Sequence, residues 1–246
     1  MKNVLLLKAG DAAASVQLSV GDYESWFIET VGMERCRFDI RHVHRGAPLP
    51  PSAAGYDAVM MTGSPASVTQ PEPWMQRAAD FMLDTAARGT PVLGVCFGHQ
   101  LLAHAHGAQV VRNVVHGREI GLVQVQLSAE GLEDALFHGL PRSFTVYATH
   151  EDIVERAPAG ATVLAGNENT ALQALAFGPL IRGVQFHPEV QPAAMRALIL
   201  ARADKLELEA TERGMGVGER VPRLLAGLTP SQSGQRILFN FLERFT

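Results

Sequence analysis

A cysteine stands in a short glycine-flanked segment that has the pattern of a turn between a strand and a helix. Residues 94–100 read GVCFGHQ, after the apolar residues 91–93 and before the apolar residues 101–103. Glycines permit a tight, strained turn at Cys96, and the N–H groups that begin a helix favour an anion. Such a position can lower the pKa of a thiol from about 8.5 to roughly 3.5–7.5. A lone cysteine is more often a buried core residue, so a nucleophilic role needs a partner elsewhere in the chain.

That partner is a histidine in a second segment. Residues 183–189 read GVQFHPE and follow a predicted strand at 180–185. His187 then lies at a strand end, where α/β proteins place their chemistry. We expect His187 to deprotonate Cys96 and Glu189 to orient the imidazole. Alone, His-Pro-Glu is compatible with a surface loop, but together with the cysteine turn it predicts a Cys-His-Glu triad.

The two segments together resemble the class I glutamine amidotransferases, the triad-type glutaminase domains found in GMP synthase and carbamoyl-phosphate synthetase. The segments lie about 90 residues apart, as in that family, and the likeness runs over roughly three quarters of the chain. The stand-alone GMP-synthase-like members are the most similar. The resemblance implies that Cys96 attacks the side-chain amide of glutamine. Ammonia then leaves, and water hydrolyses the γ-glutamyl thioester.

The same resemblance assigns an oxyanion hole. Residues 56–65, YDAVMMTGSP, form a predicted strand that runs into a Gly-Ser-Pro turn. In the family this turn donates a backbone N–H to the oxyanion, together with the residue after the cysteine. Here the donors would be Ser64, supported by Gly63, and Phe97. Many relatives carry glycine where this chain has Ser64.

The resemblance also assigns substrate contacts. Residues 146–152, VYATHED, resemble the family's loop over bound glutamine, so Thr149 and His150 would hold the amino-acid end of the substrate, largely through backbone atoms. Gln100, one helical turn past the cysteine, would contact the same substrate. His150 is the rival to His187 as the base, and it ranks second because no Pro-Glu follows it.

The elements that must position these residues follow from the apolar pattern. Runs at 4–7, 58–61 and 92–95 read as buried parallel strands, with helical stretches between them. This alternation, with the resemblance, predicts an α/β fold: a flavodoxin-like, mostly parallel sheet with helices on both faces. The other expected elements are strands at 35–40, 109–115, 120–127, 144–148, 162–166, 172–177 and 180–185, and helices at 21–31, 73–88, 101–106, 193–211 and 235–244.

The chain is expected to hold one domain with a C-terminal extension. Residues 1–190 would be the glutaminase domain, and residues 191–246 a helical cap of the same domain. The glycine-rich residues 214–218, GMGVG, predict a loop or hinge within that cap.

Composition narrows the setting. The chain has 246 residues and a formal net charge of −4, which does not suggest a nucleic-acid partner. Two cysteines, Cys36 and Cys96, make no disulfide framework, and Cys36 is expected to be a structural thiol. No signal-peptide pattern or apolar run of about 18 residues is recognisable. We therefore expect a cytoplasmic protein with no membrane contact.

Metal and cofactor sites find no support in residue spacing. His99, His104 and His106 crowd one predicted helix, but their spacings do not share a helical face well. His42 and His44 could point the same way from a strand, yet no third ligand stands at a recognisable spacing. Phosphate-loop and dinucleotide fingerprints are not recognisable either. We expect neither a metal nor a cofactor.

Three functions stay open from the sequence. The first is a glutamine-hydrolysing amidotransferase acting alone or with a synthetase subunit that receives the ammonia. The second is a γ-glutamyl peptide or amide hydrolase that uses the same triad. The third is a non-catalytic regulatory subunit, against which the complete set Cys96, His187 and Glu189 argues.

Overall fold

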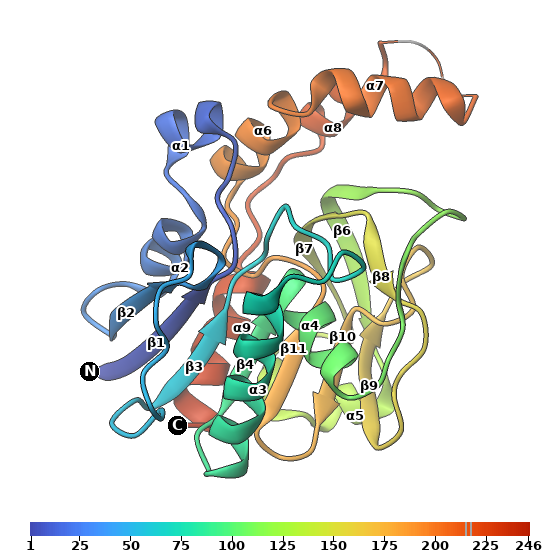
Figure 1. Cartoon of the computed structure of the whole chain (residues 1–246). Helices are drawn as coiled ribbons and strands as arrows, with labels where there is room; N and C mark the ends of the chain where they lie inside the picture. The colour runs from blue at the N-terminus through green and yellow to red at the C-terminus, as the bar shows by residue number, and fades with distance from the viewer. Residues whose placement is uncertain (215, 217) are drawn as a thin grey trace.

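The computed structural model describes residues 1–214, 216 and 218–246, and its centre is a nine-stranded sheet (Figure 1). The strands lie in the order β2-β1-β3-β4-β11-β10-β9-β6-β7, and β5 and β8 form a separate pair. The strand bounds are β1 Lys2–Lys8, β2 Cys36–His42, β3 Ala58–Met61, β4 Val92–Val95, β5 Val110–Arg112, β6 Glu119–Leu127, β7 Ser143–His150, β8 Asp152–Val154, β9 Ala161–Gly166, β10 Ala174–Phe177 and β11 Ile181–Val184.

The half of the sheet from β2 to β11 is parallel. Strand β1 pairs with β2 and β3, and β4 pairs with β3 and β11, all in parallel. The carboxyl ends of these strands therefore share one edge of the sheet. The register pairs Val95 at the end of β4 with Val184 at the end of β11. The residues that follow these two strands are thus brought close together.

The other half, from β10 to β7, is antiparallel. Strand β10 pairs with β11 and β9, and β6 pairs with β9 and β7, each in antiparallel register. Its last pair places Glu119 of β6 opposite His150 of β7. The predicted antiparallel extension is therefore confirmed.

Helices cover both faces of the sheet, as expected (Figure 1). Successive side chains of β1 point to opposite faces of the sheet, and both faces are buried. Val4 and Leu6 join the core beneath α2 and α9, whereas Leu5 and Leu7 join the core beneath α3 and α4. The helix bounds are α1 Ala14–Val20, α2 Tyr23–Val31, α3 Pro73–Ala87, α4 Phe97–Ala105, α5 Ala129–Glu133, α6 Pro192–Leu200, α7 Ala203–Glu212, α8 Arg220–Ala226 and α9 Ser233–Arg244, with 3₁₀ turns η1 Val43–Arg45 and η2 Ala135–Phe137.

Helices α6 and α7 form an arm, hereafter the C-terminal arm (residues 192–212), above the sheet edge where the parallel strands end. Met195 and Leu198 of α6 pack in a separate apolar cluster with Val16 of α1. Leu206 of α7 is buried in the same cluster. From there α7 extends over the β6–β8 side of the molecule (Figure 1). Among the described residues, no helix is both long and apolar enough to cross a membrane.

Several element predictions need correction. The helix expected at 193–211 is broken at Ala201 and Arg202, so that α6 and α7 differ in direction. The strand expected at 109–115 is only three residues long, and β8, α1 and α8 were not expected. The predicted hinge at 214–218 includes 215 and 217, which lie outside the described residues.

Candidate active site

Cys96 occupies a strained turn between β4 and α4. Its φ of 50° makes it the one non-glycine residue with positive φ among the residues that the structure describes, a conformation that costs on the order of 1–3 kcal/mol. Two glycines make the turn possible. A Cβ at Gly94 would lie 2.5 Å from the Gly98 backbone, and a Cβ at Gly98 would lie 2.9 Å from the Met61 carbonyl oxygen. Strain of this kind is characteristic of functional sites.

His187 and Glu189 follow β11, the parallel neighbour of β4. His187 Nδ1 lies 2.7 Å from Glu189 Oε1, and both side chains are buried. The backbone also fixes them: the His187 N–H donates to the Tyr147 carbonyl, and the Thr30 hydroxyl donates to the Glu189 carbonyl. The imidazole is therefore held in one orientation by a charged partner.

His187 and Cys96 lie next to each other around Gly63. A Cβ at Gly63 would lie 2.7 Å from His187 Cε1 and 3.6 Å from Cys96 Cβ, so the ring and the cysteine flank the same glycine. His187 Nε2 is buried and has no hydrogen-bond partner within the described residues. A buried nitrogen without a partner calls for an explanation, and proton exchange with the thiol provides one.

Electrostatics favour the imidazolium form of His187. Burial lowers the pKa of His187, but the negative charges of Glu189 and Cys96 outweigh it and raise the pKa from 6.5 to about 10. At neutral pH the proton therefore resides on His187, where a leaving amine can receive it.

Gln185 is a contact that the sequence did not reveal. Its Nε2 donates to Cys96 Sγ at 3.6 Å, and its Oε1 accepts from Gln100 Nε2 at 3.1 Å. Gln100 Nε2 also donates to the Asp152 carbonyl at 2.8 Å. An amide N–H aimed at the sulfur stabilises a thiolate. In the sequence, only the position of Gln185, two residues before His187, placed it near the site. No sequence pattern predicts the direction in which its side-chain amide points.

The Gly-Ser-Pro turn is anchored to the end of β1. The Ser64 hydroxyl donates to the Ala9 carbonyl at 2.8 Å and accepts from the Ala66 N–H. The Thr62 hydroxyl accepts from the Ala9 N–H at 3.0 Å. Both Ser64 bonds require its side-chain hydroxyl. Within the described chain, the backbone N–H groups of Ser64 and Phe97 donate to no protein acceptor, so both are available to an oxyanion.

The imidazole of His150 is held by contacts within the protein. Its Nε2 lies 3.0 Å from Glu119 Oε2, and its Nδ1 lies 3.2 Å from the Asp152 carbonyl oxygen. Both nitrogens are therefore occupied, which argues against His150 as the base. Thr149 Oγ1, in contrast, is buried with no partner within the described residues.

A polar pocket of about 480 Å³ opens beside Cys96. Proteins hold small ligands in pockets of roughly this size. Five of the nine predicted site residues line it, namely Ser64, Cys96, Gln100, Thr149 and His150. The C-terminal arm contributes Arg202 and Lys205 to the same pocket, and no sequence pattern indicated that contribution.

Two histidine groups have other environments. His99 is fully buried, and desolvation lowers its pKa to about 3, so it stays neutral. His42, His44 and Asp11 place one ligand atom each within 4.8 Å of one another, and Asp11 was not foreseen as a third ligand. However, Lys8 Nζ and Arg45 Nη2 contact Asp11 at 3.0 and 2.7 Å. Two positive charges on that carboxylate disfavour a metal cation.

Comparison with known proteins supports the sequence resemblance. The family model described as glutamine amidotransferase class-I matches residues 22–204. A subunit of the glutamine-hydrolysing GMP synthase of Sulfurisphaera tokodaii is 39% identical over 137 residues, 55% of this chain and 69% of that protein. Gamma-glutamyl peptidase 5 of Arabidopsis thaliana is 26% identical over 191 residues, 76% of each protein. The crystal structure of a glutamine amidotransferase of Thermotoga maritima superposes with a TM-score of 0.75 at 24% identity, over 99% of this chain and 97% of that one, and shares its fold.

Proposed function

The chain belongs to the class I glutamine amidotransferase family, and we propose that it releases ammonia from glutamine through a Cys96-His187-Glu189 triad. The observation that carries the proposal is the strained Cys96 beside the buried His187–Glu189 pair, whose contact is 2.7 Å. Nucleophile, base and orienting carboxylate in that order define a covalent hydrolase.

The reaction begins with attack on the amide. The Cys96 thiolate forms a bond to the side-chain carbonyl carbon of glutamine, and the oxygen becomes negatively charged. The N–H groups of Ser64 and Phe97 are the donors for that oxyanion. As the C–N bond breaks, the His187 imidazolium gives its Nε2 proton to the nitrogen, and ammonia leaves.

Hydrolysis of the thioester completes the cycle. His187, now neutral, takes a proton from water, and the hydroxide attacks the γ-glutamyl carbonyl carbon. The C–S bond breaks, glutamate leaves, and Cys96 is again a thiolate beside the imidazolium. Thr149, His150 and Gln100 are proposed to hold the amino-acid end of the substrate, because they line the same pocket.

The test is ammonia release from glutamine by the wild type and two cysteine variants. We expect Cys96→Ala to lose turnover by at least about 10³-fold, and Cys36→Ala, which removes the other cysteine, to keep it. Because Cys36 and Cys96 are both buried, circular dichroism of each variant verifies the fold. Undiminished turnover by Cys96→Ala would refute the proposal.

A γ-glutamyl peptide or amide hydrolase is the second candidate. The relative named gamma-glutamyl peptidase 5 aligns over 76% of this chain, more than the 55% aligned with the GMP synthase relative. The same triad would act, with an amine other than ammonia as the leaving group. Glutamate release from γ-glutamyl dipeptides with little release from glutamine would favour this candidate.

The ammonia acceptor and the role of the C-terminal residues are further proposals. A relative that is itself one subunit of a GMP synthase supports an acceptor site on a separate synthetase subunit. We also propose that residues 191–246 cap the domain formed by residues 1–190, because Arg202 and Lys205 line the catalytic pocket. Assays with and without a co-purified partner test the first point.

A further inference from the structure

Positive side chains from two separate parts of the chain line the pocket beside Cys96. Arg112 and Arg118 come from the segment around β5 and β6, and Arg202 and Lys205 come from the C-terminal arm. The acidic lining residues are Glu151 and Asp152, hence a formal charge of +4 − 2 = +2. The whole chain carries −4. The pocket is therefore opposite in sign to the rest of the molecule.

The carboxylates of the pocket do not neutralise this excess. Glu151 is shared by Arg112, Arg118 and Lys205, whose Nζ lies 3.1 Å from Glu151 Oε2. Glu209, which does not line the pocket, also pairs with Arg118 and Lys205, but it is shared with Arg220 as well. Two carboxylates shared by four cations leave the positive charge only partly compensated.

Arg202 differs from the other three cations of the pocket. Each of those has a carboxylate partner, whereas no carboxylate lies within ion-pair distance of Arg202 among the described residues, and its Nη1 donates to the Leu198 carbonyl at 3.3 Å. A guanidinium without a carboxylate partner, next to a catalytic pocket, is suited to an anionic ligand.

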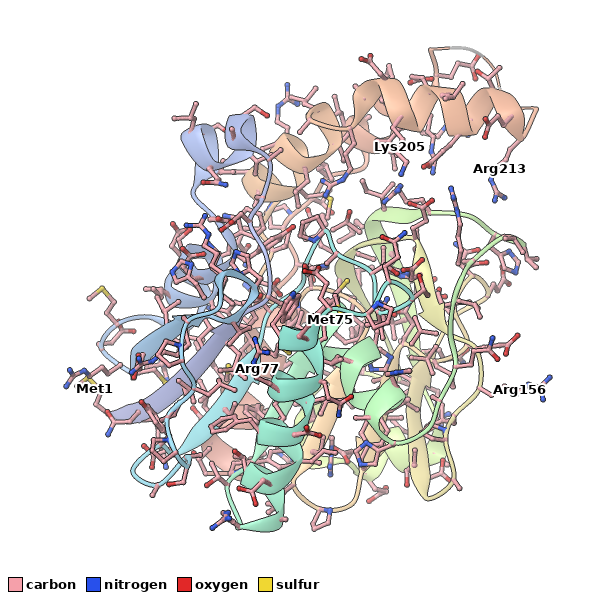
Figure 2. The ribbon with its side chains drawn as sticks, in the orientation of Figure 1. Met1, Met75, Arg77, Arg156, Lys205 and Arg213 are labelled. Atoms are coloured by element: carbon pink, nitrogen blue, oxygen red, sulfur yellow. The ribbon has the colours of Figure 1, made fainter. Side chains whose placement is uncertain are left out.

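Lys205 approaches the pocket from above. Its side chain projects from α7 toward the body of the protein (Figure 2), where it lines the pocket with Arg202. Arg156, in contrast, points away from the molecule at its far edge (Figure 2). The arm thus places two cations on the side of the pocket opposite the strands.

The leaving group of glutamine is ammonia, which offers no anion to Arg202 and Lys205. We propose that Arg202 and Lys205 bind a carboxylate on the leaving amine, so that γ-glutamyl compounds with an acidic leaving group are preferred over neutral ones of equal size. This inference rests on the proposed γ-glutamyl chemistry at Cys96. A γ-glutamyl peptide ending in a free carboxylate is the simplest substrate of the class.

A matched pair of substrates tests the inference. γ-Glutamyl-glycine ends in a carboxylate, and γ-glutamyl-glycinamide has nearly the same size without the charge. We expect wild-type kcat/KM to be about tenfold higher for the charged substrate, because the free energy of one charge-assisted hydrogen bond corresponds to about that factor. Arg202→Gln should abolish most of that preference, and Arg202→Lys should restore part of it. Lys205→Gln is a second variant, and Arg156→Gln is the control that removes an exposed charge outside the pocket.

The outcomes separate the inference from the proposed function. Loss of the preference in Arg202→Gln and Lys205→Gln, but not in Arg156→Gln, supports the inference. Equal kcat/KM for the two substrates in the wild type overturns it but leaves the triad in place. Equal losses by Arg202→Gln on both substrates also overturn it, since the cations would then hold the glutamyl end. Inactivity on every γ-glutamyl substrate would contradict the proposed function itself.

Discussion

The carboxylate of Glu189 should control both the rate and its pH dependence. Burial lowers the pKa of His187, but its charged partners raise it further, to a net value of about 10 from 6.5. A net rise of about 3.5 at 1.36 kcal/mol per pKa unit corresponds to about 5 kcal/mol in favour of the imidazolium. Because Glu189 and Cys96 together also offset the burial, Glu189→Gln should lose at least about 2–3 kcal/mol, which lowers the pKa of His187 by about two or more.

The rate consequence falls on the second half of the reaction. During thioester hydrolysis His187 becomes an imidazolium as it takes the proton from water, and Glu189 stabilises that charge at 2.7 Å. Loss of about 2–3 kcal/mol should lower kcat about 10²-fold, less than His187→Ala, which removes the base altogether.

The assay is ammonia release between about pH 6 and pH 10.5. The alkaline limb of kcat/KM should lie near pH 10 in the wild type and move to clearly lower pH in Glu189→Gln, because the negative charge that favours the imidazolium is gone. Glu243→Gln is the control, because Glu243 is an exposed acid paired with Arg35. If the alkaline limb of Glu189→Gln coincides with that of the wild type, the proposed role of Glu189 is wrong.

Three further perturbations test other contacts of the site. Ser64→Gly removes both hydroxyl bonds of the oxyanion turn, so kcat should fall about tenfold with little change in KM; an unchanged kcat would show that the turn needs no anchor. Gln185→Leu removes the N–H aimed at Cys96 Sγ, so kcat/KM should fall about tenfold; an unchanged kcat/KM would exclude stabilisation of the thiolate by this amide. The folded-state pKa of His187 is raised above its unfolded value of 6.5, so its contribution to stability is complete below about pH 6.5 and disappears as pH rises through about 10. Urea unfolding should therefore show a wild-type advantage over Glu189→Gln that is constant near neutral pH and shrinks as pH rises toward and through about 10, and an advantage that grows over that alkaline range would contradict the sign.

Much of the parallel half of the sheet and the turn at Cys96 follow from local sequence. The runs at 4–7, 58–61 and 92–95 are short, apolar and separated by helices, and each forms a strand within the parallel sheet. The glycines around Cys96 predict the turn because close backbone contact excludes a side chain there. Such short-range steric rules need no knowledge of the rest of the fold.

The remaining features depend on contacts between distant segments. The helix breaks at Ala201 and Arg202, where neither Gly nor Pro in the sequence predicts a break. The direction of α7 depends on its packing against α8 through Leu206. The amide of Gln185 reaches Cys96 only because β11 lies beside β4. The cationic pocket joins residues around 112–118 to residues 202–205, and no local pattern connects them.

Covalent trapping of the nucleophile tests the central claim most directly. The protein would be incubated with a glutamine-like diazo ketone, and intact-mass and peptide mass spectrometry would locate the adduct. We expect one adduct per chain on Cys96, slowed by excess glutamine and lost in Cys96→Ala but kept in Cys36→Ala. An adduct on Cys36 instead, or an unmodified Cys96 in a preparation that hydrolyses glutamine, would contradict the account.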